Sequence, residues 1–161
     1  MKRVSIAVTS VFLGILVAGV ALAEKSKTEL IAEAESAGPR SVTKDATIKS
    51  PDGKVLREGS NGWICYPQQA IIGPMCNRPQ WDELLDAMLN KKPIDVKEFS
   101  VSYMLAGEGE ALGVSNTDPY ATKPTDNNDW VKEGPHVMIT VPDPAILEGL
   151  STDPKDPVYV M

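Results

Sequence analysis

The apolar positions divide the chain into a continuous N-terminal run and a body of short alternating segments. Lys2 and Arg3 precede an apolar stretch over residues 4–23 that ends in the tripeptide ALA at 21–23. A basic start, an apolar centre and an A-x-A end are typical of a secretory signal peptide. We therefore predict that residues 1–23 are a signal peptide and that the mature protein is periplasmic or secreted.

A retained membrane anchor is the alternative interpretation, because an apolar run of about 20 residues can cross a bilayer. Ser5, Thr9 and Ser10 interrupt the run, and its end fits cleavage after Ala23. No later segment is apolar enough to span a membrane. After cleavage we expect no membrane contact.

One segment of the body has the periodicity of an amphipathic helix. Over residues 78–91, apolar side chains recur at the spacing of one helical face: Trp81, Leu84, Leu85, Met88 and Leu89. Pro79 suits a first turn, Asn77 is a candidate N-cap, and Pro93 ends the pattern. We predict one clear helix here.

The other apolar segments are short and indicate strands. A turn at 50–53 joins two strands of a hairpin, and further strands are predicted at 63–66, 99–106, 136–141 and 158–161, with a short helix at 145–150. In 99–106 the side chains alternate, so that Phe99, Val101, Tyr103 and Leu105 share one face and Ser100, Ser102 and Met104 share the other.

This order of elements predicts an α+β fold with a mainly antiparallel sheet, one clear helix and many loops. Residues 42–161 form a single globular domain in this interpretation. The polar lead-in at 24–41 is either a short surface helix or a mobile tail, and the polar stretch at 107–135 is a long loop that Trp130 and Val131 hold to the domain.

Charge excludes one class of function. Removing the signal segment takes away two of the 16 basic residues and none of the 22 acidic ones, so the formal net charge falls from −6 to about −8. An acidic surface without a basic cluster repels nucleic acid. We expect no nucleic-acid partner.

The two cysteines, Cys65 and Cys76, predict a structural disulfide in an exported domain. A redox pair is the alternative, but such pairs usually have the tighter C-x-x-C spacing.

His136 is the single histidine, which excludes sites that need two. If the protein is a small hydrolase, His136 would be its acid or base, with Asp118 or Glu110 as partner; Glu108 and Glu110 with Asp118 would be the carboxylates of a glycosidase. We assign no catalytic residue and no cofactor.

Two metals remain alternatives without an assigned ligand set. His136 and Met138 share a strand face, and a His/Met set suits copper, although methionines also fill gaps in a core. Oxygen ligands in the long loop suit calcium, but the spacing of Asp126, Asn127, Asn128 and Asp129 does not match a calcium loop, and turn formation also explains these residues.

Several segments resemble an uncharacterised group of exported bacterial proteins. Because no activity is known for this group, the resemblance implies none for this chain. These segments are DATI at 45–48, REGSNGWIC at 57–65, GPMC at 73–76, SYML at 102–105, SNTDP at 115–119, GPHVM at 134–138 and YVM at 159–161. The resemblance covers most of the mature chain. Members of the group continue past the YVM segment.

These segments suggest one ligand pocket, if they converge in space. Its candidate residues are Asn61, Trp63, Met75, Tyr103, Asn116, Asp118 and His136. The sequence thus predicts an exported, periplasmic binding or interaction protein of unknown ligand, with a small hydrolase or a copper- or calcium-dependent protein as the alternative.

Overall fold

The computed structural model describes residues 25–161; the predicted signal peptide lies outside these residues. A six-stranded sheet has the order β2-β1-β3-β4-β5-β8, and a two-stranded sheet pairs β6 with β7. Only β1 and β3 are parallel within the large sheet, so the predicted α+β fold with a mainly antiparallel sheet is confirmed. The strands are β1 (Thr47–Lys49), β2 (Val55–Arg57), β3 (Ile64–Tyr66), β4 (Met75–Asn77), β5 (Ser100–Met104), β6 (Val114–Ser115), β7 (Trp130–Val131) and β8 (His136–Thr140).

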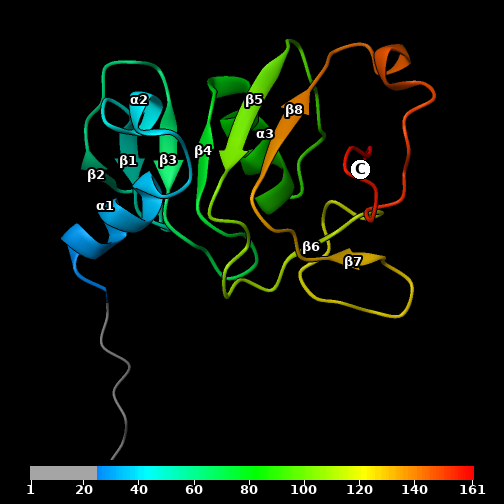
Figure 1. Ribbon diagram of the computed structural model, residues 1–161, viewed down its shortest axis with the longest axis horizontal. Helices are drawn as coiled ribbons and strands as arrows, with labels where there is room; N and C mark the ends of the chain where they lie inside the picture. Colours follow the sequence, from blue (N-terminus) through cyan, green and yellow to red (C-terminus); the bar gives the residue numbers. More distant parts are fainter. Residues whose placement is uncertain (1–24) are drawn as a thin grey trace, which may run out of the picture.

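Helices cover the two faces of the large sheet at different places. On one face, α1 (Lys27–Glu35) packs on β2, β3 and β4, with α2 (Arg40–Thr43) beside it. On the opposite face, α3 (Pro79–Leu89) packs on β4 and β5. Figure 1 shows α1 and α2 in front of the first strands and α3 behind the sheet. The two faces are called the α1 side and the α3 side below.

The lead-in forms a helix rather than a tail. Ser26 and Glu29 make a capping box at the start of α1, which satisfies backbone groups that a helix end otherwise leaves unpaired. Ala34 and Ala37 are fully buried against the sheet. Small side chains therefore allow the helix to approach the strands closely, although its apolar stripe is thin.

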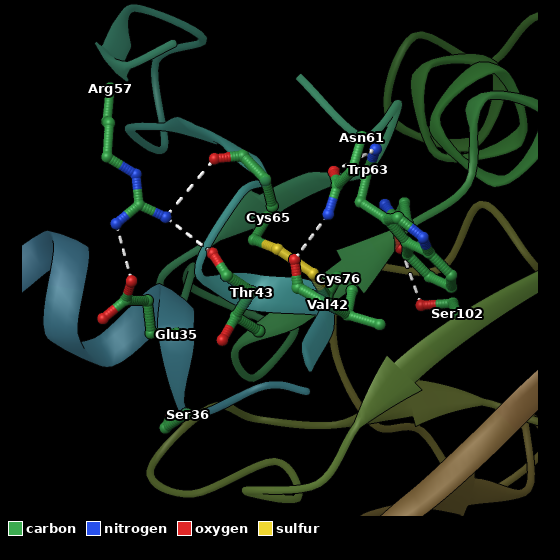
Figure 2. The surroundings of a disulfide bond; sticks show 12 residues. Glu35, Ser36, Val42, Thr43, Arg57, Asn61, Trp63, Cys65, Cys76 and Ser102 are labelled. Atoms are coloured by element: carbon green, nitrogen blue, oxygen red, sulfur yellow. Dashed lines mark hydrogen bonds and ion pairs between the residues drawn. A yellow bond between two sulfur atoms is a disulfide. The ribbon is translucent and has the colours of Figure 1, made fainter. Parts of the chain in front are cut away.

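The predicted disulfide is present on the α1 side. Cys65 of β3 and Cys76 of β4 lie directly opposite each other in the antiparallel pair and are bonded. Both are fully buried, in a cluster with Ala34, Ala46 and Ile48. Figure 2 shows the bond together with Val42, which packs against this cluster. The disulfide joins neighbouring strands inside the core, which is a structural role.

A charged side chain holds α1 and α2 to the edge of the sheet. Arg57 of β2 contacts Glu35 through Nη1 at 2.6 Å and donates through Nη2 to the Thr43 carbonyl at 2.6 Å and the Ala46 carbonyl at 3.3 Å (Figure 2). The Arg57 guanidinium thus binds α1, α2 and the segment before β1.

The alternation predicted around β5 is confirmed, but its polar side chains lie on the more buried face. Ser100, Ser102 and Met104 are buried on the α3 side. The Ser102 hydroxyl donates to Asn77 Oδ1 at 2.6 Å, and both residues are fully buried. This hydrogen bond offsets part of the cost of burying two polar side chains on this side of the sheet, whereas Asn77 Nδ2 has no hydrogen-bond partner among the described residues.

Two predicted local features differ in the structure. Asn77 is not the N-cap of α3: it belongs to β4, and Arg78 occupies the cap position without a side-chain bond. The predicted last strand is reduced to one bridge between Ser151 and Tyr159. One bridge does not give residues 158–161 the ladder of backbone hydrogen bonds that a strand needs. The short helix predicted at 145–150 is present as a 3-10 helix at Pro144–Leu147.

Candidate binding surface

The α1 side of β5 and β8 is an apolar surface that no helix within residues 25–161 covers. Tyr103 pairs with Val137 and Val101 pairs with Ile139, so these side chains share one face of the two strands. Val137 and Ile139 are 50% and 55% exposed, and Phe99 at the start of β5 is 61% exposed. In Figure 1, α1 and α2 lie over the first strands of the sheet, and β3 and β4 separate them from β5 and β8. We call Phe99, Val101, Val137 and Ile139 the open face.

Aromatic and cationic side chains mark the border of the open face. The Trp63 and Tyr103 rings stack with centroids 5.2 Å apart, and the Arg78 guanidinium lies 5.7 Å from the centroid of Trp63. Together with Phe99 and Val101 they line a cavity of about 270 Å³. The border therefore combines a hollow for an apolar group with one positive charge.

The open face reaches the edge of the sheet at β8. In the part of the chain that the structure describes, this strand of five residues pairs only with β5, and it contains no Asp, Glu, Lys, Arg or Pro. The opposite edge strand, β2, has three residues, one of which is Arg57. Short strands and charges usually protect sheet edges from pairing with other chains. β8 lacks this protection.

A second, larger hollow lies between the β1–β2 turn and α3, with a volume of about 820 Å³. Its polar centre is Tyr66, whose hydroxyl donates to Asp82 Oδ1 at 2.7 Å, while Lys49 Nζ lies 3.3 Å from both the hydroxyl and Asp82 Oδ2. Burial and the Asp82 carboxylate raise the pKa of Tyr66. These three groups satisfy one another, which leaves no unpaired group that points to a ligand.

The seven predicted pocket residues do not gather in one place. Trp63 and Tyr103 stack on the α1 side, and Asn61 adjoins them by accepting from the Trp63 backbone N–H at 3.1 Å. Met75 is buried on the α3 side with Met104. A sheet separates these groups, so they cannot line a common pocket.

The predicted loop residues bond mainly to one another and to neighbouring backbone, with one further bond from Asn116 to the Thr152 carbonyl. Asp118 is exposed and its Oδ1 accepts from the Tyr120 N–H at 2.9 Å; Asn116 donates to Asp129 Oδ2 at 2.9 Å. Asn128 is buried and bonds to Lys123 and Thr125. These contacts are those of turn-forming Asx residues. Among residues 25–161, no three His, Cys, Asp or Glu side chains gather as a metal site.

His136 does not contact either of its predicted catalytic partners. It is half-buried at the start of β8, and its Nδ1 is 2.7 Å from the Gly134 carbonyl oxygen. Within the described residues it makes no ion pair or hydrogen bond to a carboxylate, and Glu110 is exposed. A general base needs its partner within hydrogen-bond reach, so the geometry lends the hydrolase hypothesis no support.

The carboxylate that the structure does single out is Glu108. It is almost completely buried, and its Oε2 accepts from the Gly73 N–H at 2.6 Å. Burial raises the pKa of Glu108, and this effect exceeds the opposing effects of the Gly73 hydrogen bond and of His136. Glu108 joins the turn after β5 to the segment before β4, which is a structural role.

Comparisons with protein-family models, with curated proteins and with solved structures find no match. Among residues 25–161, the structure has no helix of the length and apolarity that crossing a membrane requires. The disulfide is compatible with an exported protein.

Sequence reasoning found Trp63 and Tyr103 but missed the open face around them. The signal was available: residues 99–106 and 136–141 both alternate, and each places its larger apolar side chains on one face. What the sequence did not indicate is that α1 stops short of these strands.

Proposed function

We propose that the protein is an exported interaction protein that binds an extended polypeptide segment of a partner along β8 and the open face. The observation that supports this most is the exposure of Val137 and Ile139 on a strand that also forms an unprotected sheet edge. Contiguous exposed apolar side chains mark interaction sites in folded proteins.

An extended chain fits this place better than a helix or a small molecule. β8 offers backbone N–H and C=O groups at the sheet edge, which a further strand can pair with. In such a complex every second side chain of the added strand faces the α1 side. These side chains would continue the apolar surface of Val137 and Ile139.

The border of the open face supplies selectivity in this proposal. The cavity lined by Trp63, Phe99 and Tyr103 accepts one bulky apolar side chain. Arg78, which lies over Trp63, would favour a carboxylate near that side chain. The preferred ligand is therefore an extended segment with alternate apolar residues and an acidic group.

Export belongs to the same proposal. The signal peptide over residues 1–23, cleaved after Ala23, would deliver the protein to the periplasm or outside the cell, where the buried Cys65–Cys76 bond persists. The resemblance to exported bacterial proteins agrees with this location.

The proposal is tested by selecting peptides from a displayed random library on the mature protein and measuring their affinity for variants. Ile139→Lys places a charge on the open face and should abolish binding. The matched control is Ile146→Lys, because Ile146 is 65% exposed but lies on the 3-10 helix outside the open face. Both substitutions are at exposed positions and should leave stability within about 0.5 kcal/mol. Failure to select any peptide, or equal binding by the two variants, contradicts the proposal.

A further inference from the structure

The α3 side of β5 and β8 carries a group of soft donors that the proposed function does not use. His136 of β8 is the direct partner of Met104 in β5, and Met138 follows two residues after His136 on the same side. Met104 belongs to the buried cluster that also contains Met75, and Met138 packs against this cluster. Three thioethers and the one imidazole of the chain therefore lie on the same side of three neighbouring strands, β4, β5 and β8.

We infer that His136, Met104 and Met138 form a binding site for a soft monovalent metal ion, Cu(I) or Ag(I). Thioether sulfur and imidazole nitrogen are the donors that such ions prefer over carboxylates. Opposite residues of an antiparallel pair have Cβ atoms about 4.5–5.5 Å apart. Methionine has three rotatable bonds, so its sulfur can turn toward an ion held by the neighbouring imidazole.

The hydrogen bond at Nδ1 of His136 leaves Nε2 available to bind a metal ion. Nδ1 lies 2.7 Å from the Gly134 carbonyl oxygen, which can only accept, so Nδ1 carries the proton and Nε2 has the free lone pair of the neutral ring. Metal-binding histidines usually donate their second N–H to a carbonyl or carboxylate in this way. The orientation of the ring is thus fixed by the backbone before any ion binds.

The position of the group allows an ion to enter. His136 and Met138 are half-buried on the edge strand, whereas Met104 lies fully buried next to them. The donors thus extend from the surface into the core. Both cysteines are held in the buried disulfide, so no thiol competes for the ion.

Silver nitrate is the probe for the first experiment, because Ag(I) needs no reductant and leaves the disulfide intact. Titration of the mature oxidised protein in chloride-free buffer should show one bound Ag(I). Loss of even a hydrogen-bond partner of a ligand usually costs a metal site 10–100-fold in affinity, so Met138→Leu and His136→Gln should each weaken binding at least about tenfold. Met88→Leu on α3 is the control and should leave the affinity unchanged.

A second measurement does not depend on any variant folding. Ag(I) should shift the methyl NMR signals of Met104 and Met138 in the unaltered protein and leave those of Met88 and Met161 in place. The inference is overturned if no Ag(I) binds, if Met138→Leu and His136→Gln bind as Met88→Leu does, or if the Met88 or Met161 signals respond instead. None of these results bears on peptide binding to the open face, which lies on the other side of the sheet.

Discussion

The Trp63 indole stacks on the Tyr103 ring, 5.2 Å between centroids, where the part of the sheet under α1 and α2 meets the open face. Asn61 fixes the approach to this pair, since it accepts from the Trp63 N–H and donates to the Val42 carbonyl at 2.7 Å. The aromatic pair is therefore anchored to α2 on one side. On the other side Tyr103 lies opposite Val137, the first apolar residue of the uncovered edge strand.

Removal of the disulfide should destabilise the protein without changing its fold. The bond closes a loop with a sequence separation of 11, for which the loop-entropy relation gives about 3 kcal/mol. We expect the Cys65→Ala/Cys76→Ala variant to lose about this much free energy of unfolding in a urea titration. Because both cysteines are fully buried, the native protein should also resist mild reductant. Rapid reduction under native conditions would contradict a purely structural role.

Substitution of Arg57 tests how α1 and α2 are held to the sheet. Arg57→Met removes contacts to Glu35, Thr43 and Ala46 while keeping much of the side-chain bulk. Hydrogen bonds to charged groups contribute about 1.5–3 kcal/mol, so we expect a loss of about 2 kcal/mol in the free energy of unfolding.

Lys44→Met is the matched control for Arg57. Lys44 pairs with Asp45 at 3.5 Å, and both side chains are exposed. Exposed pairs contribute at most about 1 kcal/mol, so this variant should lie close to the unaltered protein in the same titration. Equal losses in the two variants would refute the anchoring role of Arg57.

Glu108 should make stability depend on pH. Burial raises its folded-state pKa above the ordinary value of 4.5, so between these two values the folded state binds more protons than the unfolded state. The stabilising effect of protonation is complete below pH 4.5 and is lost as pH rises through the folded-state pKa. Glu108→Gln keeps an oxygen for the Gly73 N–H but cannot ionise.

Urea titrations of both proteins between pH 4 and pH 8 provide the measurement. The unaltered protein should lose stability relative to Glu108→Gln as pH rises across this range. A constant difference between the two proteins, or a difference that changes in the opposite direction, would show that the Glu108 pKa is not raised.

Patterns within single elements predicted much of the fold. The spacing of Trp81, Leu85 and Met88 located α3, and proline and glycine at 51 and 53 located the hairpin turn. These features depend on residues close together in the chain, so the sequence alone is enough to predict them. The buried disulfide followed from the presence of two cysteines in a predicted exported domain.

Features that depend on distant neighbours could not be predicted in this way. Ser102 is buried because Asn77, 25 positions earlier, accepts its hydrogen bond. The parallel pairing of β1 with β3 depends on how the chain passes through β2. The single pocket proposed for Met75 and Trp63 failed for the same reason, since the sheet places them on opposite sides.

Amide hydrogen exchange of the mature protein, with and without a selected peptide, tests the central claim most directly. If an extended segment pairs with the sheet edge, exchange at His136–Thr140 should slow on binding, and Ile139→Lys should remove this effect while Ile146→Lys retains it. The account is contradicted if β8 exchanges at the same rate in both states while protection appears at the hollow beside α3, around Asp82 and Leu89.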